Sequence, residues 1–338
     1  MFFSKRLIVA GYNNANLGDD LMFATVVNSA NYSNCYFYGP QLKPAFIEKD
    51  IGFIKYGRGV PIRWKLGADF ALIGGSLFMG ENDTHMEMFK WKLKLLRLNK
   101  LLGGKNFVLG SNLGPYRDYD EYVYALKKVV KLVDHWKVRD RYSYELLLKV
   151  GAKNVEFIPD IVMGFDLSDY YEIEPKKLIS ISVTDVNKDG NKLLKQDLFE
   201  KEVVELIERY HLQGYSAELV SFEDSKDLTV MERIKQKVTS SGSVELVKNI
   251  DDNVLKSIAS ADVVVSTRFH CMVLSALLNK SQIIYQYSQK TANFAERYGF
   301  NVYQICGDAS KKTPVSTGFD AKDTEFASNM FKSMESLA

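Results

Sequence analysis

The sequence predicts an α/β protein built from two similar halves, each with a parallel sheet covered by helices. Short apolar runs alternate with segments of helical periodicity along the whole chain, which is the pattern of doubly wound sheets. Two of these runs, ADFALIGGS and NFVLGSNLGP, are continuously apolar before their glycine turns, as is typical of strands buried on both faces of a parallel sheet. The length of 338 residues suits two domains, because one domain usually takes roughly 100–200 residues.

The first half opens with a strand, a polar loop and a helix. The strand is LIVA (residues 7–10), and the loop GYNNANLGDD leads into the helical stretch LMFATVVNSA. Two further strands with glycine turns are predicted at ADFALIGGS and NFVLGSNLGP. Helices are expected at residues 87–102, 120–131 and 143–150, and Gly151 stands where a helix commonly stops.

The second half repeats this order. Strands are predicted at KLISISVTD, SAELVSF, ADVVVSTRF and QIIYQYS, with helices at residues 197–210 and 272–278. Between the halves, residues 166–177 show little hydrophobic periodicity and place four acidic residues before Pro175. We therefore expect one domain at residues 1–170 and another at residues 171–338, with a C-terminal helix able to pack back on the first domain.

Composition narrows the function classes. Lys and Arg number 44 against 42 Asp and Glu, a net charge of +2, which argues against a broad nucleic-acid surface. Cys35, Cys271 and Cys306 form no CxxC pair, which favours a reducing compartment. The first apolar run is too short for a signal segment and no run reaches spanning length. We expect a cytoplasmic protein. The histidines and cysteines also lack metal-ligand spacing.

The segment STRFH (residues 266–270) follows a buried strand and precedes a helix, where α/β sheets present their ligands. Arg268 offers a planar fork of donors suited to phosphate or carboxylate. His270 offers proton transfer near neutral pH, and the helix start adds unpaired N–H groups. The alternative is that both side chains are structural hydrogen-bonding groups.

Charge along this segment favours an anionic ligand. Residues 263–295 contain no Asp or Glu but include Arg268, Lys280 and Lys290. In a nearly neutral chain, this excess of cations predicts one compact anion site.

Two other loops are candidates for ligand contacts. Residues 11–20 form a Gly/Asn-rich turn that can cradle a phosphate or carboxylate, although Asp19 or Asp20 can instead cap the helix. The turn has neither P-loop nor GxGxxG spacing. Residues 137–141 (KVRDR) end a strand with basic side chains, and a surface ion-pair cluster is the alternative. Asp160, at a third strand end, is more often structural.

The run from Phe89 to Leu102 carries Lys90, Lys92 and Lys94 as well as further cations. A basic amphipathic helix of this kind can lie on an anionic membrane surface. The alternative is an ordinary domain helix with an apolar inner face and solvated lysines.

Together these segments resemble the polysaccharide pyruvyl transferase family along most of the chain. The family's N-terminal glycine–asparagine–GD loop is similar to GYNNANLGDDL, its glycine-ended strand to ADFALIGGSLF and its GP loop to VLGSNLGP. Its RD helix entry resembles VRDRYSYELLLKVG. Its most specific signature, an RxH segment followed by a lysine loop, resembles STRFHCMVLSALLNKSQIIYQYSQKTANFAERYGF.

The resemblance implies two Rossmann-like domains facing each other across a cleft, in a GT-B-like arrangement. It implies transfer of pyruvate from phosphoenolpyruvate to a sugar of a cell-surface glycan or its lipid-linked precursor, with no cofactor and no metal. The acceptor would lie on the N-terminal side and phosphoenolpyruvate on the C-terminal side.

The residues that the resemblance assigns fall into two groups. Arg268 and His270 take the donor-binding and catalytic positions. Substrate contacts are implied for Asn16, Gly18, Asp19, Gly74, Gly75, Arg139, Ser266, Thr267, Phe269 and Lys290. The chain departs from the family pattern at Ser76, which replaces a third glycine, and at Thr184, where many relatives carry a basic residue.

Other function classes stay open at this point. A GT-B glycosyltransferase would use a nucleotide sugar, and such enzymes usually bind the donor's ribose with a carboxylate of the C-terminal domain. The acid-free stretch disfavours this class, but Glu296 lies close enough in the sequence to keep it open. A silent sensor protein is the third class, which Arg268 and His270 argue against. For the acceptor, Tyr12, Tyr116 and Trp64 are candidate stacking surfaces.

Overall fold

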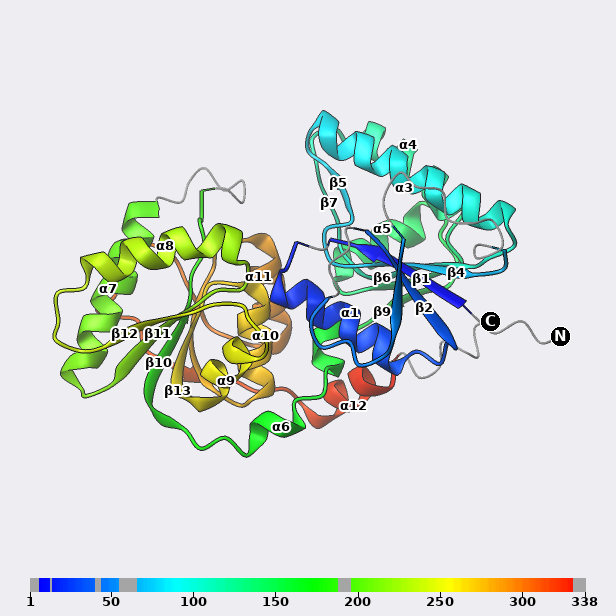
Figure 1. Ribbon diagram of the computed structural model, residues 1–338. Helices are drawn as coiled ribbons and strands as arrows, with labels where there is room; N and C mark the ends of the chain where they lie inside the picture. Colours follow the sequence, from blue (N-terminus) through cyan, green and yellow to red (C-terminus); the bar gives the residue numbers. More distant parts are fainter. Residues whose placement is uncertain (1–5, 13, 40–43, 55–65, 188–195, 331–338) are drawn as a thin grey trace. The chain divides into compact units, whose positions relative to one another are not determined.

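The computed structural model describes residues 6–330 apart from residues 13, 40–43, 55–65 and 188–195. The chain divides into two compact units (Figure 1). Unit 1 takes the described residues of Met1–Asn14, Asp19–Phe165 and Glu325–Ala338, and unit 2 takes those of Ala15–Gly18 and Asp166–Thr324. The chain thus passes into unit 2 at Asp166, where the sequence places the boundary near residue 170.

Unit 1 is built on a parallel sheet with the strand order β3-β2-β1-β4-β6-β8-β9. Its strands are β1 (Arg6–Gly11), β2 (Asn34–Tyr38), β3 (Ile51–Ile54), β4 (Asp69–Ile73), β6 (Asn106–Ser111), β8 (His135–Val138) and β9 (Val155–Phe157). Two short strands, β5 (Phe78–Gly80) and β7 (Leu113–Tyr116), pair separately. Because every pairing is parallel, all strands of this sheet have their carboxyl ends on the same side, which we call the carboxyl edge of the sheet.

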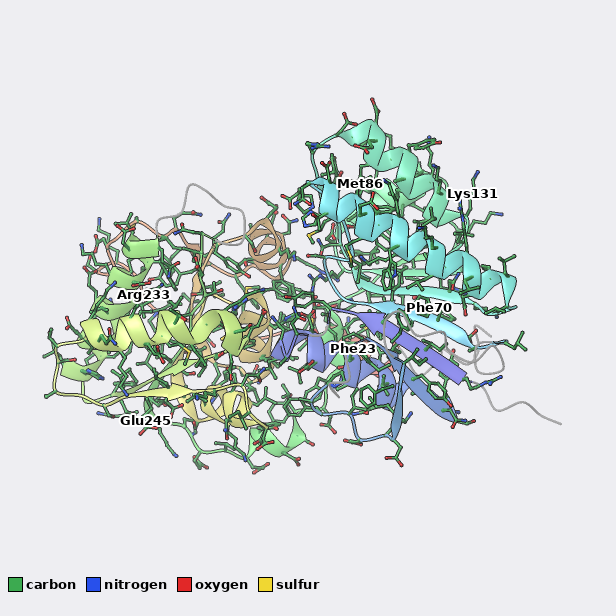
Figure 2. The ribbon with its side chains drawn as sticks, turned by 45° about the horizontal axis from the view of Figure 1, so that its top comes forward. Phe23, Phe70, Met86, Lys131, Arg233 and Glu245 are labelled. Carbon is green, nitrogen blue, oxygen red and sulfur yellow. The ribbon has the colours of Figure 1, made fainter. Side chains whose placement is uncertain are left out.

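Helices cover both faces of this sheet. On one face lie α3 (Asp83–Leu101), α4 (Tyr119–Val130) and α5 (Arg141–Lys149), with α3 and α4 side by side in Figure 1. Met86 of α3, labelled in Figure 2, is buried. The opposite face receives α1 (Leu17–Ser29), whose Phe23 meets Phe37 of β2 with ring centroids 4.9 Å apart. The 3₁₀ turn η1 (Ile161–Gly164) contacts α12 (Ala321–Asn329) near Gly164.

Unit 2 has a second sheet, ordered β12-β11-β10-β13-β14-β15, with β16 antiparallel to β14. The strands are β10 (Lys176–Ser182), β11 (Ser216–Val220), β12 (Val244–Val247), β13 (Ala261–Ser266), β14 (Ser281–Tyr285), β15 (Val302–Tyr303) and β16 (Val315–Ser316). Before them comes the short helix α6 (Ser168–Tyr171), inside the segment predicted as a linker.

Alternating residues of β10 divide the two faces of the second sheet. Ile179 and Ile181 pack with α7 (Gln196–Leu212) and α8 (Asp224–Lys237), the helix that carries Arg233 in Figure 2. On the other face Ser180 shares a hydrogen bond with Ser257 of α9 (Asn253–Ser260) at 2.8 Å. The helices α10 (Phe269–Leu277) and α11 (Gln289–Tyr298) follow β13 and β14. Both units are therefore α/β layers with parallel sheets.

Candidate active site

Three neighbouring strands of unit 2 end in small hydroxyl residues. Ser182 closes β10, Ser221 follows β11, and Thr267 follows β13. The Ser182 hydroxyl accepts hydrogen bonds from the backbone N–H groups of Thr267 (2.9 Å) and Arg268 (3.2 Å). This strand-to-strand contact fixes the loop that turns into α10.

The start of α10 is suited to an anion. Arg268 occupies the N-cap position and gives no side-chain capping bond, and the positive end of the helix dipole lies at this loop. Nearby, the Oγ of Ser221 and the Oγ1 of Thr267 are buried, and neither has a hydrogen-bond partner among the described residues. Buried hydroxyls without partners are costly, and a bound anion would relieve that cost at this edge of the sheet.

Arg268 is held by a carboxylate from the start of another helix. Its Nη2 donates to Oδ1 of Asp227 in the first turn of α8, and both side chains are buried. Asp227 Oδ2 also accepts the N–H groups of Phe222 (2.9 Å) and Glu223 (3.0 Å). Burial raises the pKa of the Asp227 carboxyl, and the guanidinium opposes that rise. Arg268 is therefore oriented by the fold.

These contacts correct the simple charge argument from the sequence. Residues 263–295 contain no acid, but Asp227, in the first turn of α8 and 41 positions away in the sequence, contacts Arg268. Lys280 lies at the amino end of β14 and donates to the carbonyl of Ala259. It stands at the opposite edge of the sheet from Arg268, so the three cations of this stretch do not form one cluster.

His270 is packed against a glycine. A Cβ on Gly18 would lie 1.7 Å from Nδ1 of His270, so only glycine allows the imidazole to approach this backbone so closely. The Phe269 ring meets the His270 ring edge-on at 5.1 Å and the Phe294 ring at 5.3 Å. Phe269 therefore belongs to the packing that holds the imidazole in place.

The N-terminal loop is joined to the same unit through Asn16. Its Oδ1 accepts the N–H of Gly18 (3.1 Å) and its Nδ2 donates to Oε2 of Glu223 (3.2 Å). Asn16 thus caps α1, whereas Asp19 and Asp20 lie inside the first turn. This differs from the alternative in which one of the two aspartates caps the helix.

Unit 1 holds a second polar cluster at the carboxyl ends of its strands. Arg139 donates to Oδ2 of Asp160 (2.6 Å) and to Oδ1 of Asn112 (3.1 Å). A Cβ on Gly75 would lie 2.2 Å from Nη2 of Arg139, so this glycine makes room for the guanidinium. Gly74, with φ of 136°, turns the chain after β4. The charge of Arg139 is balanced by a buried carboxylate.

The sequence model of the polysaccharide pyruvyl transferase family matches residues 16–289. That match covers most of the chain and spans both polar clusters. The chain belongs to the polysaccharide pyruvyl transferase family.

Solved structures with the same fold confirm the expected GT-B-like class for this pyruvyl transferase family member. The putative UDP-N-acetylglucosamine 2-epimerase of Listeria monocytogenes is 10% identical, with 98% of this chain and 96% of that one covered and a TM-score of 0.59. S. aureus MnaA, solved with UDP, is 12% identical over 99% and 98%, with a TM-score of 0.57. The UDP-GlcNAc 2-epimerase of Methanocaldococcus jannaschii is 9% identical over 96% and 99%, with a TM-score of 0.55. No curated protein sequence matches the chain.

The remaining predicted residues of this family member lie in or beside the loops that follow the unit 2 strands. Ser266 donates to Oε1 of Gln282 (2.7 Å) and so supports β14. Thr184 is buried just beyond β10, Lys290 is the second residue of α11, and Glu296 is exposed farther along that helix. Trp64 lies outside the described residues.

Several residues of these clusters were not predicted from the sequence. Ser182, Asp227, Glu223 and Asn112 each hold a predicted residue in place. Asp227 could have been found from the acidic residues that follow SAELVSF. A carboxylate in the first turn of the next helix can reach the ends of neighbouring strands. Ser182 gives no such signal, because a small polar residue in a buried strand has many structural roles.

Neither a candidate metal-binding cluster nor a membrane-spanning helix is found in the part of the chain that the structure describes. No three His, Cys, Asp or Glu side chains gather there in a way that could hold a metal ion. Likewise, none of the helices in these ranges has both the length and the apolar character needed to cross a bilayer.

Proposed function

We propose that this protein transfers the pyruvyl group of phosphoenolpyruvate to a sugar of a cell-surface polysaccharide or its lipid-linked precursor. The product is a pyruvate ketal, and phosphate is released. One observation carries the proposal: in a member of this family, the edge made by Ser182, Ser221 and Thr267 adjoins Arg268 and the start of α10. Phosphoenolpyruvate brings a phosphate and a carboxylate, which hydroxyl and N–H donors bind well.

The chemistry needs a proton at the methylene carbon of phosphoenolpyruvate. As that carbon is protonated, C2 becomes cationic and bonds to one acceptor hydroxyl. The bond between C2 and the phosphate oxygen then breaks, and a second acceptor hydroxyl bonds to C2. Of the two hydroxyl protons, one balances the proton placed on the methyl carbon and the other leaves with phosphate.

The chain's own residues suit these steps. His270 can supply the first proton or take one from an attacking hydroxyl, and Gly18 and Phe269 fix the position of its ring. Arg268 and the N–H groups of α10 stabilise the charge of the departing phosphate. Because Asp227 orients Arg268 before substrate arrives, little reorganisation is needed.

Turnover is the direct test of this proposal. Incubation with phosphoenolpyruvate and an acceptor glycan should release phosphate and yield an acid-labile ketal in equal amounts, seen by a phosphate assay and mass spectrometry. His270→Ala should abolish both products. Full turnover by that variant would contradict the assignment of His270.

A second donor class is favoured by one finding. S. aureus MnaA, which shares the fold, was solved with UDP, so a nucleotide sugar is the competing donor for this chain. Thermal-shift titration distinguishes the two donors, because only the true donor should stabilise the folded protein strongly.

We further propose a cytoplasmic enzyme that meets lipid-linked acceptor at the membrane surface through α3. The inner face of this helix is core, with Phe89, Leu96 and even Lys92 buried. Burial lowers the pKa of Lys92 to about 8. The outer face exposes Leu98 and Leu101 together with the cations Lys94 and Arg97. Sedimentation with anionic vesicles, but not with neutral ones, would support this contact.

A further inference from the structure

Unit 1 carries a group of tyrosines that the reaction steps above do not use. Tyr116 ends β7, Tyr119 begins α4, and Tyr142 is the second residue of α5. The ring centroids of Tyr116 and Tyr119 are 5.7 Å apart, and the hydroxyls of Tyr116 and Tyr142 are 2.6 Å apart. We call these three rings the tyrosine platform.

The platform faces solvent although it is held from below. Tyr119 and Tyr142 are 38% and 45% exposed, whereas Tyr122, which packs against Tyr116, is 1% exposed. The Tyr122 ring stacks on Tyr116 at 4.8 Å. Its hydroxyl accepts the N–H of Gly114 (3.0 Å) and donates to the carbonyl of Phe78 (2.8 Å). The position of Tyr116 is thus set by a buried ring with both hydrogen bonds made.

A second set of bonds fixes the side of the platform that carries Tyr142. Ser143 Oγ accepts the N–H of Leu113 (2.7 Å) and donates to Oδ2 of Asp140 (2.7 Å). Asp140 also caps α5 by accepting the N–H of Ser143 (2.8 Å). The chain around Tyr116 and the chain around Tyr142 are therefore tied together, and the rings start from a preorganised position.

Polar atoms surround the rings. Lys149 Nζ donates to the Tyr119 hydroxyl (3.0 Å) and lies 5.3 Å from the centre of that ring. Burial and the bond to Tyr116 raise the pKa of Tyr142, so its hydroxyl stays protonated at neutral pH. The platform thus offers flat apolar faces, hydroxyl groups and one ammonium group in a small area.

The platform also lies near the expected ligand edge. Tyr116 and Tyr142 follow strands β6 and β8 at their carboxyl ends, close in sequence to Asn112 and Arg139. Ligands of open α/β sheets bind at this edge.

We propose that the tyrosine platform binds a sugar ring of the acceptor glycan. A pyranose has a C–H face that packs on an aromatic ring and a rim of hydroxyls that need donors and acceptors; tyrosine supplies both at low entropic cost. This inference rests on the proposed function, because it assigns the subsite of the sugar that function requires.

The test measures sugar binding without phosphoenolpyruvate. Cellobiose is the probe, since its equatorial substituents leave axial C–H groups on both ring faces. Saturation-transfer NMR should show these C–H protons in contact with the wild-type protein. Tyr142→Ala and Tyr119→Ala should each weaken binding about fivefold to tenfold, and Tyr142→Phe should weaken it less. Tyr124→Ala is the matched control, because Tyr124 is 65% exposed on the same helix as Tyr119 but outside the platform.

The outcomes separate this inference from the proposed function. Loss of binding in the platform variants but not in Tyr124→Ala supports it, even if the wild type never releases phosphate from phosphoenolpyruvate. No cellobiose signal, or equal signals in all variants, overturns it, even if phosphate release proceeds.

Discussion

The carboxylate of Asp227 binds the guanidinium of Arg268 at the carboxyl edge of the unit 2 sheet, with both side chains buried. Asp227 lies in the first turn of α8, and Arg268 is the N-cap residue of α10. The same carboxylate accepts the backbone N–H groups of Phe222 and Glu223 just before α8, so one buried group links the starts of both helices.

Removing the charge of Asp227 should therefore cost stability as well as donor binding. Asp227→Asn leaves Arg268 buried without a counter-charge, and the free energy of unfolding should fall by about 3 kcal/mol. Urea denaturation measures this loss. Glu232→Gln on the same helix is exposed and should change stability by less than about 0.5 kcal/mol. Equal stability of both variants would contradict the role given to Asp227.

Gly18 should tolerate no side chain. A Cβ there would lie 1.7 Å from Nδ1 of His270, so Gly18→Ala must displace the imidazole, and kcat for phosphate release should fall about a hundredfold. Gly214→Ala is the control: its φ is 80° with nothing near its Cβ position, so it costs about 1 kcal/mol of backbone strain without touching the site. A Gly18→Ala enzyme with normal kcat would show that the imidazole position does not matter.

Asp20 should make the free energy of unfolding depend on pH between about 4 and 7. Burial raises the pKa of this carboxyl from 3.8 to about 7. The folded state then keeps a proton that the unfolded state loses, so the contribution of Asp20 to stability falls as the pH rises from about 4 to about 7. Within that window the loss is about 1.4 kcal/mol for each pH unit. Asp20→Asn should remove this slope.

The comparison of melting curves at two pH values isolates this effect. Asp20→Asn should be more stable than the wild type at pH 8 and similar to it near pH 4. Asp120→Asn alters an exposed first-turn aspartate of α4 and should show no such difference. A constant offset between Asp20→Asn and the wild type would disprove the raised pKa.

The effects of substitutions at Arg139 and Asp160 on the free energy of unfolding should not be additive. Both side chains are buried and their atoms approach to 2.6 Å, so Asp160→Leu alone should destabilise the protein by about 3 kcal/mol. The double variant Arg139→Met/Asp160→Leu should recover most of that loss, because no lone charge remains. Additive losses in denaturation experiments would mean that the pair is not coupled.

Much of the fold could be predicted because its central strands are continuous apolar runs. The segments that form β1, β4, β6 and β13 are of this type, whereas β10 alternates isoleucine with serine. β2 (NCYFY) and β3 (IGFI) lie at the end of their sheet and are short or mixed in polarity, so periodicity did not reveal them. Likewise α8 has a polar exposed surface that masks the buried Val230 and Ile234.

The candidate site was predictable only as a set of loops. Strand ends locate Arg268, His270 and Arg139, because parallel strands present ligands at their carboxyl ends. Which carboxylate meets which guanidinium depends on long-range packing: Asp227, in the first turn of α8, and Asp160, just before η1, reach their partners from other parts of the chain. The contact of Gly18 with His270 joins residues more than 250 positions apart in the sequence, which local patterns do not encode.

Donor binding tests the central claim most directly. Titration of the wild-type protein with phosphoenolpyruvate should raise its melting temperature, corresponding to about 2.7 kcal/mol at a concentration of about one hundred times Kd. Arg268→Lys keeps the charge but loses the planar fork and should lose most of that stabilisation, and UDP-N-acetylglucosamine should have no effect on either protein. Stabilisation by the nucleotide sugar and none by phosphoenolpyruvate would contradict the account.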